Sequence, residues 1–394
     1  MRILHTSDWH LGRSFGPVSL EEDQKAFIDW MIGQCIKERI DLVVIAGDVF
    51  DRAIAPTEAV VMFRDALTRL LITGVKVAVI TGNHDGAERV AAYDDLLDRS
   101  GLFVRGGYSR TGEVLSLSFN DGPLDLLLLP FLDPQAAPDD LPDSTIEVTD
   151  DQANDAFENR IRRTHQSVIE AAITAARPHL SAPRSIVVSH AFVAGSSTSD
   201  SERQISIGGA GTVDASLFNG FSYTALGHLH RPQLIAGNET VRYSGTPLAY
   251  SFSEEHPKSI TIVDMAPDGK CRIEAVQIPI GRGVCTITGT IDELLGCEPT
   301  PAVARSLVRA IITDPGVVLD AKQRLTKVYP HVVEIELRSS MDTSGRPGGA
   351  IDRRTASTIE VVDAFWVASV GAEPSEDERD LLHQAVTADK DGVA

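Results

Sequence analysis

Short apolar runs rich in β-branched residues recur along the first 270 residues, and each is followed by a polar turn. Continuous runs such as Leu42-Val43-Val44-Ile45 are typical of strands buried on both faces, as in a layered α/β domain. The predicted strands are Arg2 to His5, Asp41 to Ala46, Val75 to Thr81, Ser185 to Ser189, Tyr223 to Leu226 and Ser259 to Val263. We therefore expect an α/β fold in which these strands form the interior.

Helical patterns lie between the strands. Apolar residues recur at three-to-four spacing over 59–71, with Pro56 near the start and Gly74 just past the end, which predicts a helix. Residues 151–177 predict a second long helix. The Pro- and Asp-rich stretch 133–150 predicts a surface loop that carries no motif.

The chain beyond residue 280 has a different organisation. It predicts a small α/β unit with strands at 283–289, 308–312 and 332–337 and helices at 302–307 and 319–329. A stretch rich in Ser, Gly, Pro and Arg then predicts a flexible linker. We expect a main domain over 1–280, a capping domain over 281–338, a linker over 339–357 and a helical segment over 358–388.

Two apolar stripes at helical spacing lie in the last segment. The first is Ile359, Val362, Phe365 and Trp366, and the second is Leu381, Leu382, Ala385 and Val386. Two short helices beyond a linker cannot bury such stripes alone, so they either fold back on the body or bind another protein. The apolar pattern alone leaves both alternatives open.

Composition narrows the function classes. No apolar run reaches the roughly 18 residues that a membrane span needs, and the start of the chain lacks a secretory signal pattern, so a cytoplasmic protein is expected. The four cysteines show neither CxxC pairing nor zinc-finger spacing, which predicts reduced packing cysteines. The net charge of −20 disfavours unaided binding to DNA, because such binding requires basic surface. Either the substrate is small, or metal ions and a partner supply positive charge.

Metal-ligating residue types follow five of the predicted strands. They occur in Asp8-Trp9-His10, Gly47-Asp48, Gly82-Asn83-His84-Asp85, His190 and Gly227-His228-Leu229-His230. The carboxyl ends of strands in an open α/β sheet share one edge, so these side chains should meet in one cleft. Imidazole nitrogens and carboxylate or amide oxygens, without a thiolate, suit two divalent ions of the Mn or Fe type.

Spacing supports the same interpretation. Residues two apart in an extended segment point the same way, so the pairs Asp8/His10 and His228/His230 can each reach one cleft. The glycines that precede the motifs lie where a side chain would crowd a tight turn. Each motif alone is weak, and their order and their shared place after strands carry the argument. The other histidines are expected to be structural or solvated, with His5 packed inside a strand.

This series of motifs resembles the calcineurin-like metallophosphoesterase superfamily. Further segments resemble the bacterial, SbcCD-type branch of the Mre-type repair nucleases: residues 1–12, Gly47 to Asp51, Ser199 to Arg203 followed by Ile207-Gly208, Tyr243 to Leu248, and Ser251 to Glu254. The resemblance covers the main domain and weakens after residue 280. It implies a layered metallophosphoesterase sandwich with a small α/β capping domain and a C-terminal helical tail that binds a partner.

The resemblance also implies roles for individual residues. One metal would be held by Asp8, His10, Asp48 and His230, and the other by Asp48, Asn83, His190 and His228, with Asp48 as the bridging carboxylate. His84 would remain uncoordinated as the catalytic group, oriented either by Asp85 or by a backbone carbonyl. Relatives outside bacteria carry a histidine at the position of Asp51, to which we assign no catalytic role.

The activity implied is Mn-dependent hydrolysis of DNA phosphodiesters, exonucleolytic at double-stranded ends and endonucleolytic on single strands or hairpins. The implied partners are DNA, an SbcC-type ATPase and a second copy of the chain, paired through the helices near 59–71 and 88–97. Two alternatives use the same fold: a phosphodiesterase for a small substrate such as a cyclic nucleotide, which the acidic charge favours, and a non-catalytic scaffold. Residues 199–203 could contact DNA or a partner, or form a solvated loop.

Overall fold

The computed structural model describes residues 1–138, 141, 163–202, 211–316, 318–338, 357–370 and 372–391. The chain divides into two compact units. The first comprises Met1–Cys285 with Arg305–Leu307, and the second Thr286–Ala304 with Val308–Ala394. The finer division into capping domain, linker and helical segment stays a prediction, and residues 339–356 of the predicted linker lie outside the described residues. No helix in the described ranges is long and apolar enough to cross a lipid bilayer.

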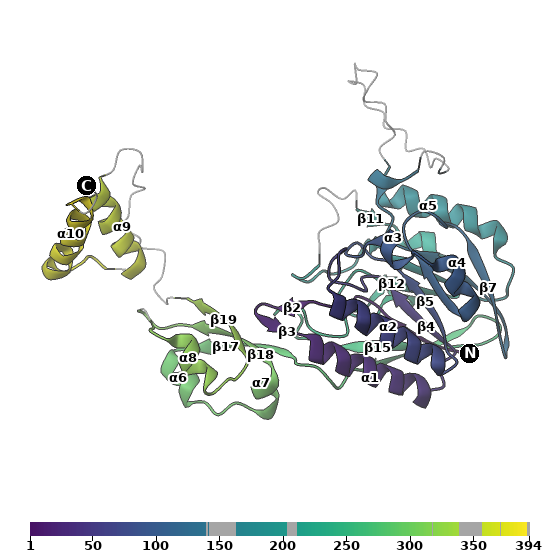
Figure 1. Ribbon diagram of the computed structural model, residues 1–394, viewed down its shortest axis with the longest axis horizontal. Helices are drawn as coiled ribbons and strands as arrows, with labels where there is room; N and C mark the ends of the chain where they lie inside the picture. Colours follow the sequence, from purple (N-terminus) through teal and green to yellow (C-terminus); the bar gives the residue numbers. More distant parts are fainter. Residues whose placement is uncertain are drawn as a thin grey trace, which may run out of the picture. The chain divides into compact units, whose positions relative to one another are not determined.

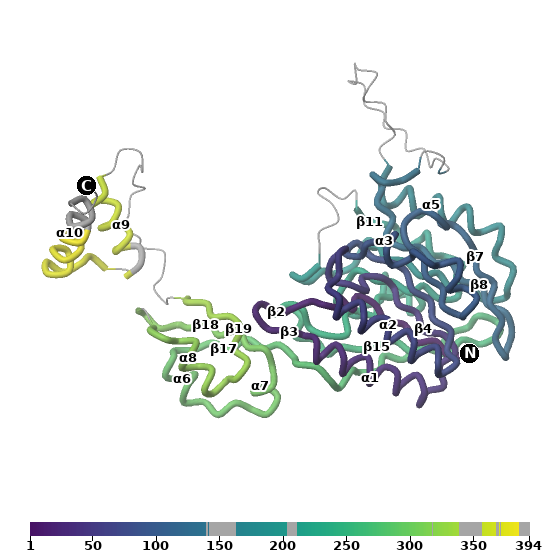
Figure 2. The backbone as a smooth tube through the Cα atoms, viewed as in Figure 1, coloured from purple at the N-terminus to yellow at the C-terminus, as the bar shows by residue number. Residues whose placement is uncertain are grey.

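The first unit contains two six-stranded mixed sheets. The strands of the first sheet are, in spatial order, β16 (Cys271–Gln277), β15 (Ser259–Met265), β1 (Arg2–Thr6), β4 (Leu42–Ala46), β5 (Lys76–Ile80) and β6 (Leu102–Arg105). The strands β1, β4, β5 and β6 run parallel, whereas β15 is antiparallel to β1. Green β15 therefore lies among the purple N-terminal elements in Figures 1 and 2.

The second sheet comes mainly from the middle of the chain. Its strands are, in spatial order, β13 (Gln233–Ile235), β14 (Asn238–Tyr243), β12 (Tyr223–Gly227), β9 (Ser185–His190), β8 (Gly122–Leu129) and β7 (Val114–Phe119). The strands β14, β12, β9 and β8 run parallel, and the edge strands β13 and β7 are antiparallel to their neighbours. The sequence analysis did not predict β7, β8, β13 or β14, and so missed that a second sheet exists.

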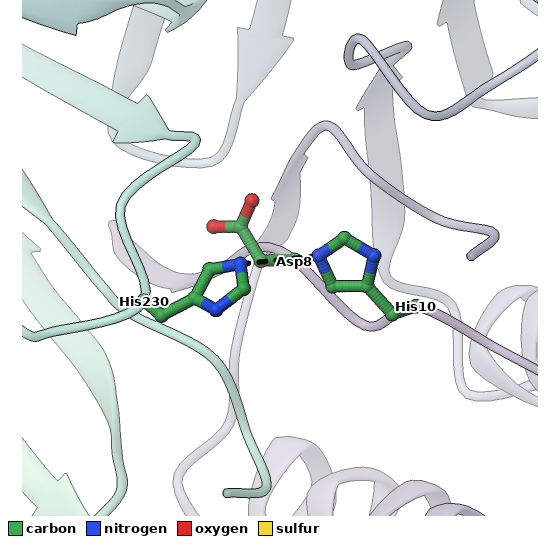
Figure 3. A group of neighbouring side chains, drawn as sticks. All are labelled: Asp8, His10 and His230. Carbon is green, nitrogen blue, oxygen red and sulfur yellow. Dashed lines mark hydrogen bonds between the residues drawn. The ribbon is translucent and has the colours of Figure 1, made fainter. Parts of the chain in front are cut away.

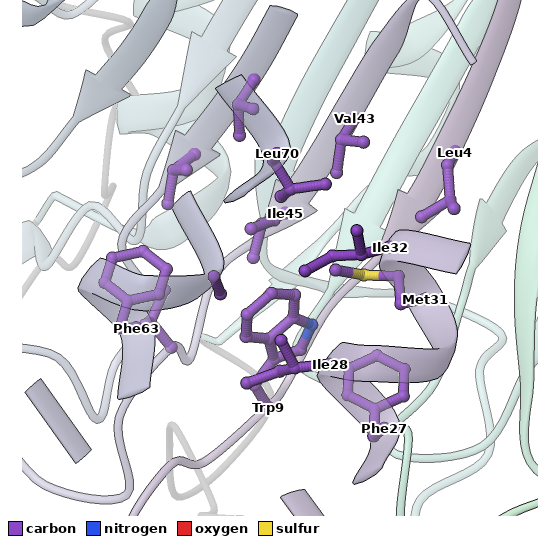
Figure 4. Close-up of a cluster of buried hydrophobic side chains, with 14 of the residues drawn as sticks. Leu4, Trp9, Phe27, Ile28, Met31, Ile32, Val43, Ile45, Phe63 and Leu70 are labelled. Carbon is purple, nitrogen blue, oxygen red and sulfur yellow. The ribbon is translucent and has the colours of Figure 1, made fainter. Parts of the chain in front are cut away.

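Helices cover the outer faces of both sheets, which gives the layered α/β class that the sequence predicts. The helices α1 (Glu21–Lys37) and α2 (Thr57–Ile72) pack on the first sheet through Phe27, Met31 and Leu70, against Val43 and Ile45 (Figure 4). On the second sheet, α5 (His165–Ala176) packs against β8 and β9. Burial of these apolar faces provides the main stabilisation, at about 25 cal/mol per Å² of apolar area.

The inner faces of the two sheets pack against each other. Val44 of β4 and Leu126 of β8 belong to one buried apolar cluster between the sheets. His5 also lies there, fully buried: its Nε2 donates to the carbonyl of Leu226 (3.2 Å), so its Nδ1 accepts from the Tyr223 hydroxyl (2.9 Å). Burial, with the charge of Arg242, lowers the pKa of His5 to about 3, so this histidine is neutral. The prediction of a packed His5 is confirmed.

The second predicted long helix is shorter than expected. Thr164 accepts a hydrogen bond from the backbone N–H of Ser167 and so caps α5, which begins at His165. The helix was predicted to begin at Asp151, but residues 163 and 164 precede its first turn, so this part of the prediction is wrong. Residues 151–162 lie outside the described residues. Of the loop predicted over 133–150, the described part contains one short 3₁₀ turn.

Short elements complete the first unit. They are β2 (Ser14–Phe15), β3 (Val18–Ser19), α3 (Ala87–Val90), α4 (Asp94–Leu97), β10 (Phe192–Val193) and β11 (Thr212–Val213). The region around residues 88–97 is therefore two single-turn helices. The glycine-rich turns and strand ends between these elements carry the polar side chains described below.

The second unit has an α/β part and a helical hairpin. A three-stranded sheet is formed by β17 (Val284–Gly289), β18 (Leu307–Ile312) and β19 (Val332–Leu337), with the helices α6 (Ile291–Gly296), α7 (Pro301–Arg305) and α8 (Ala321–Thr326). The sequence analysis missed α6. The helices α9 (Thr358–Val370) and α10 (Glu376–Asp391) follow and contact each other, with His383 Nε2 lying 3.1 Å from Asp363 Oδ1.

Candidate metal centre

The predicted metal-ligating side chains follow strands of both sheets. Asp8 and His10 follow β1, Asp48 follows β4, and Asn83 and His84 follow β5, all in the first sheet; His190 ends β9, and His228 and His230 follow β12, in the second. The expectation that one sheet edge would supply all of them is therefore wrong. The ligands meet where the carboxyl ends of the two packed sheets come together, so opposing loops surround them.

Hydrogen bonds between neighbouring loops fix the ligands from the first sheet. The backbone N–H of His10 donates to the carbonyl of Asp48 (3.0 Å). The carboxylate of Asp85 accepts from three backbone N–H groups, those of Val49 (3.1 Å), Phe50 (2.8 Å) and Gly82 (2.9 Å). Asp85 thus joins the loops after β4 and β5 and positions Asp48 next to Asn83 and His84.

Backbone strain is concentrated in these loops. Seven non-glycine residues in the described ranges have positive φ, and four of them are Asp8 (54°), His10 (45°), Asp48 (49°) and His228 (110°). Such conformations cost on the order of 1–3 kcal/mol each and persist where the surrounding structure enforces them, often at functional sites. These four strained residues lie among the polar side chains that converge at the strand ends.

Two glycines permit the close approach of these loops. A Cβ atom on Gly82 would lie 2.2 Å from Asp48 Oδ1, and one on Gly47 would lie 2.2 Å from His190 Nδ1. Both distances are shorter than any real carbon contact, so a larger residue would displace the side chains. The prediction that these glycines avoid crowding beside the ligands is confirmed.

One group of converging atoms contains Asp8, His10 and His230, whose ligating atoms lie within 4.8 Å of one another. The two imidazoles face each other beside Asp8, with 3.2 Å between His10 Nε2 and His230 Nε2 (Figure 3). His10 Nδ1 is buried and hydrogen-bonds to no described residue. The Asp8 carboxylate accepts from the backbone N–H of His228 (3.0 Å) and from the Ser7 hydroxyl (2.5 Å).

A second group is formed around Asn83. His190 Nε2 lies 3.0 Å and His228 Nδ1 lies 3.2 Å from Asn83 Oδ1. His190 Nδ1 donates to the carbonyl of Ala46 (2.9 Å), which leaves Nε2 with its lone pair directed at Asn83. Two acceptor atoms are thus brought together, an arrangement that a cation between them would stabilise.

Asp48 lies between the two groups. Its Oδ2 is 3.6 Å from His10 Nε2 and also 3.6 Å from His190 Nε2. Its Oδ1 accepts from the backbone N–H of His84 (2.9 Å). A carboxylate in this position can contact a cation in either group.

The ring of His84 is oriented by a backbone carbonyl. Its Nδ1 lies 2.8 Å from the carbonyl oxygen of Asp51, which can only accept, so Nδ1 carries the proton. The sequence analysis left Asp85 and a backbone carbonyl open as the orienting group, and the structure identifies the carbonyl of Asp51. The His84 and His10 rings meet edge to face with centroids 4.6 Å apart, which places His84 beside the first group.

The buried charges are unbalanced without a cation. Burial, followed by the nearby charge of Asp48, raises the pKa of Asp8 well above its usual range, and the same two causes raise the pKa of Asp85 to about 7. Burial lowers the pKa values of His10, His190 and His228, so these imidazoles are neutral and supply no compensating charge.

These residues fit divalent cations. Oxygen and imidazole donors converge around Asp48 in three overlapping groups: Asp8, His10 and His230; His10, Asp48 and His84; and Asp8, Asp48 and His190. The imidazoles of His10, His190 and His228 are neutral, as metal ligands must be. A bound cation would remove the repulsion that raises the pKa of Asp8.

The sequence analysis missed the side chains behind His230. Ser201 Oγ lies 2.5 Å from His230 Nδ1, Glu202 Oε1 accepts from the His230 backbone N–H (2.8 Å), and Glu254 Oε1 lies 3.3 Å from Nδ1. Ser201 and Glu202 therefore pack behind His230, whereas Asp200 between Ser199 and Ser201 is exposed. Arg203, Ile207 and Gly208 lie outside the described residues.

Comparison with known proteins identifies the class. The family model for calcineurin-like phosphoesterases matches residues 1–232. The chain therefore belongs to the calcineurin-like phosphoesterase family and is a metal-dependent hydrolase of phosphate esters. Within this family the chain is 36% identical over 301 residues to the SbcD component of the nuclease SbcCD from Bacillus subtilis (strain 168), and the match covers 72% of this chain and 71% of the relative.

The central position of Asp48 predicts that Asp48→Asn impairs both metal sites. The substitution keeps the side-chain volume and removes the negative charge that both groups share. Metal analysis of the purified variant should find both ions lost, whereas Asp51→Asn, as a nearby control, should retain them. Two tightly bound ions in the Asp48→Asn variant would contradict a bridging role.

Proposed function

We propose that this chain is a two-metal DNA nuclease, a double-strand 3′–5′ exonuclease and single-strand or hairpin endonuclease that acts with an SbcC-type ATPase in DNA end processing. The observation that carries the proposal is the convergence of oxygen and imidazole donors on both sides of Asp48 in a phosphoesterase fold. The relative, which is named as part of a nuclease, supplies the choice of DNA as substrate.

The proposed ligand sets follow the two groups of side chains. One cation would be held by Asp8, His10, Asp48 and His230, and the other by Asp48, Asn83, His190 and His228. Both would be divalent, with Mn²⁺ suited to the mixed imidazole and carboxylate donors. When bound, such a pair neutralises charge on a phosphodiester and lowers the pKa of water toward about 7.

The protein's own contribution to the reaction centres on His84. Because Nδ1 donates to the carbonyl of Asp51, the ring is fixed and Nε2 can exchange a proton at the reacting phosphate. To act as the donor, His84 must be protonated at both ring nitrogens, so that Nε2–H protonates the leaving oxygen or donates a hydrogen bond to the charge that develops on the phosphoryl oxygens. Asp85 supports His84 indirectly, by holding the loops after β4 and β5 together.

A second candidate is a phosphodiesterase for a small substrate such as a cyclic nucleotide. The net charge of −20 favours it, since affinity for DNA depends on neutralising phosphates. In a nuclease complex, the ATPase partner would supply much of the DNA-binding surface that this acidic chain lacks. A non-catalytic scaffold is the third candidate, and the strained, buried ligand cluster argues against it because such an arrangement is costly to maintain.

A nuclease assay with matched substrates tests the proposal. The purified chain with Mn²⁺ should degrade linear duplex DNA in preference to a cyclic dinucleotide, and a chelator should abolish the activity. His84→Gln should keep its metal and slow cleavage by about 10² to 10⁴-fold, the usual contribution of a general acid or base. Preference for the cyclic dinucleotide would support the small-substrate enzyme, and near-normal turnover of the variant would remove His84 from the mechanism.

The helices α9 and α10 are the proposed binding site for the ATPase. Ser357 precedes α9 and Ser375 precedes α10. The backbone N–H of each serine donates to the carboxylate of the glutamate three residues later, so both helices begin at defined points. Phe365 is 71% exposed and Leu381 66% exposed, which leaves apolar surface for a partner helix.

Removal of residues 352–394 should abolish co-purification with the SbcC-type ATPase and ATP-stimulated duplex degradation. Hydrolysis of bis-p-nitrophenyl phosphate should remain, because the metal centre lies in the first unit. Phe365→Ser with Leu381→Ser should have the same effect, whereas Leu319→Ser, another exposed leucine of the second unit, should not. Unchanged affinity of the shortened chain for the ATPase would exclude this binding site.

A homodimer through α2 and α4 is also proposed. Met62 and Phe63 of α2 are 7% and 8% exposed and pack into the core, so they are not available to a second copy. Val60 on α2 is 47% exposed, and Tyr93 and Leu96 at α4 are each 69% exposed. These three residues are the better candidates for apolar contact with a second copy.

Light scattering at micromolar concentration should give the mass of a dimer. Val60→Glu with Leu96→Glu should shift the mass to that of a monomer, because two buried, unpaired charges would be introduced at the interface. Ile36→Glu on α1, at a residue 63% exposed, serves as the control and should remain dimeric. A monomeric wild-type chain would refute the dimer.

A further inference from the structure

His230 is held from behind by carboxylates. Its side chain is 1% exposed and that of Glu254 is 0% exposed, with Glu254 Oε1 lying 3.3 Å from His230 Nδ1. Ser201 Oγ lies 2.5 Å from the same nitrogen, and Glu202 Oε1 accepts from the His230 backbone N–H (2.8 Å). Both the ring and the backbone of His230 are therefore fixed on the side opposite to Nε2, the nitrogen that points to His10.

Glu254 is itself held in place by a buried ion pair. Lys258 Nζ donates to Glu254 Oε2, and Thr246 Oγ1 lies 3.1 Å from the same oxygen. The Lys258 side chain is only 10% exposed. A buried carboxylate is tolerated when paired and hydrogen-bonded in this way. Both oxygens of Glu254 are therefore engaged, which excludes it as an additional metal ligand.

The turn that carries Glu254 is anchored in the core. The backbone N–H of Glu254 donates to the carbonyl of Ser251 (3.2 Å). The buried Phe252 within this turn meets the ring of Phe15 edge to face, with centroids 4.9 Å apart. The segment Ser251 to Glu254 is thus fixed by contacts of its own and supports His230 from behind.

Two other histidines of the centre are held by backbone carbonyls instead. His190 Nδ1 donates to the backbone carbonyl of Ala46, and His84 Nδ1 to that of Asp51. His10 Nδ1 hydrogen-bonds to no described residue, and its nearest carboxylate contact is Asp51 Oδ1 at 3.9 Å. A carboxylate behind a histidine ligand raises its basicity and fixes its tautomer, whereas a neutral carbonyl has the weaker electrostatic effect.

We propose that Glu254, held by Lys258, is a positioning residue that keeps His230 with Nδ1 protonated and Nε2 free to bind metal. It thereby strengthens the cation site of Asp8, His10, Asp48 and His230 and leaves the other site unaffected. The inference rests on the proposed function, because it assumes the two ligand sets given above. Glu254 acts through His230 and contacts neither substrate nor metal.

Calorimetric titration of the metal-free full chain with Mn²⁺ tests the proposal. The wild-type chain should bind two equivalents. In Glu254→Gln, which keeps the shape and removes the charge, one binding step should weaken by about 10- to 100-fold and the other should not change. Electron paramagnetic resonance at two equivalents should correspondingly lose the signal of the coupled Mn²⁺ pair. Glu255→Gln, at the exposed neighbouring residue, should match the wild type.

A double-mutant cycle separates positioning from a general structural role. If Glu254 acts through His230, Glu254→Gln should cause no further loss of Mn²⁺ affinity in a His230→Gln background. Because Glu254→Gln leaves the buried Lys258 without its partner carboxylate, the metal-free variant should unfold at a lower temperature than the wild type, and both chains are therefore titrated well below their unfolding transitions. Equal weakening of both binding steps, or additive losses in the cycle, would each overturn the proposal.

The two proposals fail in distinguishable ways. A wild-type chain that binds fewer than two Mn²⁺ ions contradicts the proposed two-metal function itself. Two steps in the wild type that are both unchanged in Glu254→Gln contradict only the role of Glu254.

Discussion

The rest of this structure depends on the need to balance the negative charge of two buried carboxylates, Asp8 and Asp48. Asp8 is fully buried and Asp48 is 2% exposed, and the charge of Asp48 helps to raise the pKa of Asp8. The imidazoles of His10, His190 and His228 are neutral because burial lowers their pKa values, so these three side chains do not offset the negative charge. Divalent cations satisfy this demand, and the phosphoesterase family to which the chain belongs uses such ions for its chemistry.

The packing of two sheets makes this cluster possible. The first sheet supplies both carboxylates, and the second supplies three of the histidines. His5 joins the sheets through hydrogen bonds to Tyr223 and Leu226, directly behind the strand ends that carry Asp8 and His228. The apolar layer between the sheets excludes water and strengthens electrostatic interactions among the ligands above it. Small changes in the layer would therefore alter the ligand geometry on both sides.

Sequence reasoning found the residues of the centre but not the way in which they are brought together. Asp, Asn and His after apolar strands are local signals, so the candidate ligands could be recognised without a structure. The second sheet was missed although β7 alternates apolar with polar residues, as a half-buried strand does, and the shorter or more polar strands β13 and β14 carry a weaker signal. The contacts of Glu254 and Ser201 with His230 join residues 24 and 29 positions apart, and no local pattern encodes such pairing. The sequence also could not identify the carbonyl of Asp51 as the group that orients His84, because every residue has a backbone carbonyl.

The most direct test of the account is an anomalous difference map, at the manganese absorption edge, of crystals grown with Mn²⁺. The account predicts two peaks on either side of Asp48. One should lie among Asp8, His10 and His230, and the other among Asn83, His190 and His228. A single peak, or peaks away from Asp48, would contradict the central claim that this carboxylate joins two cation sites.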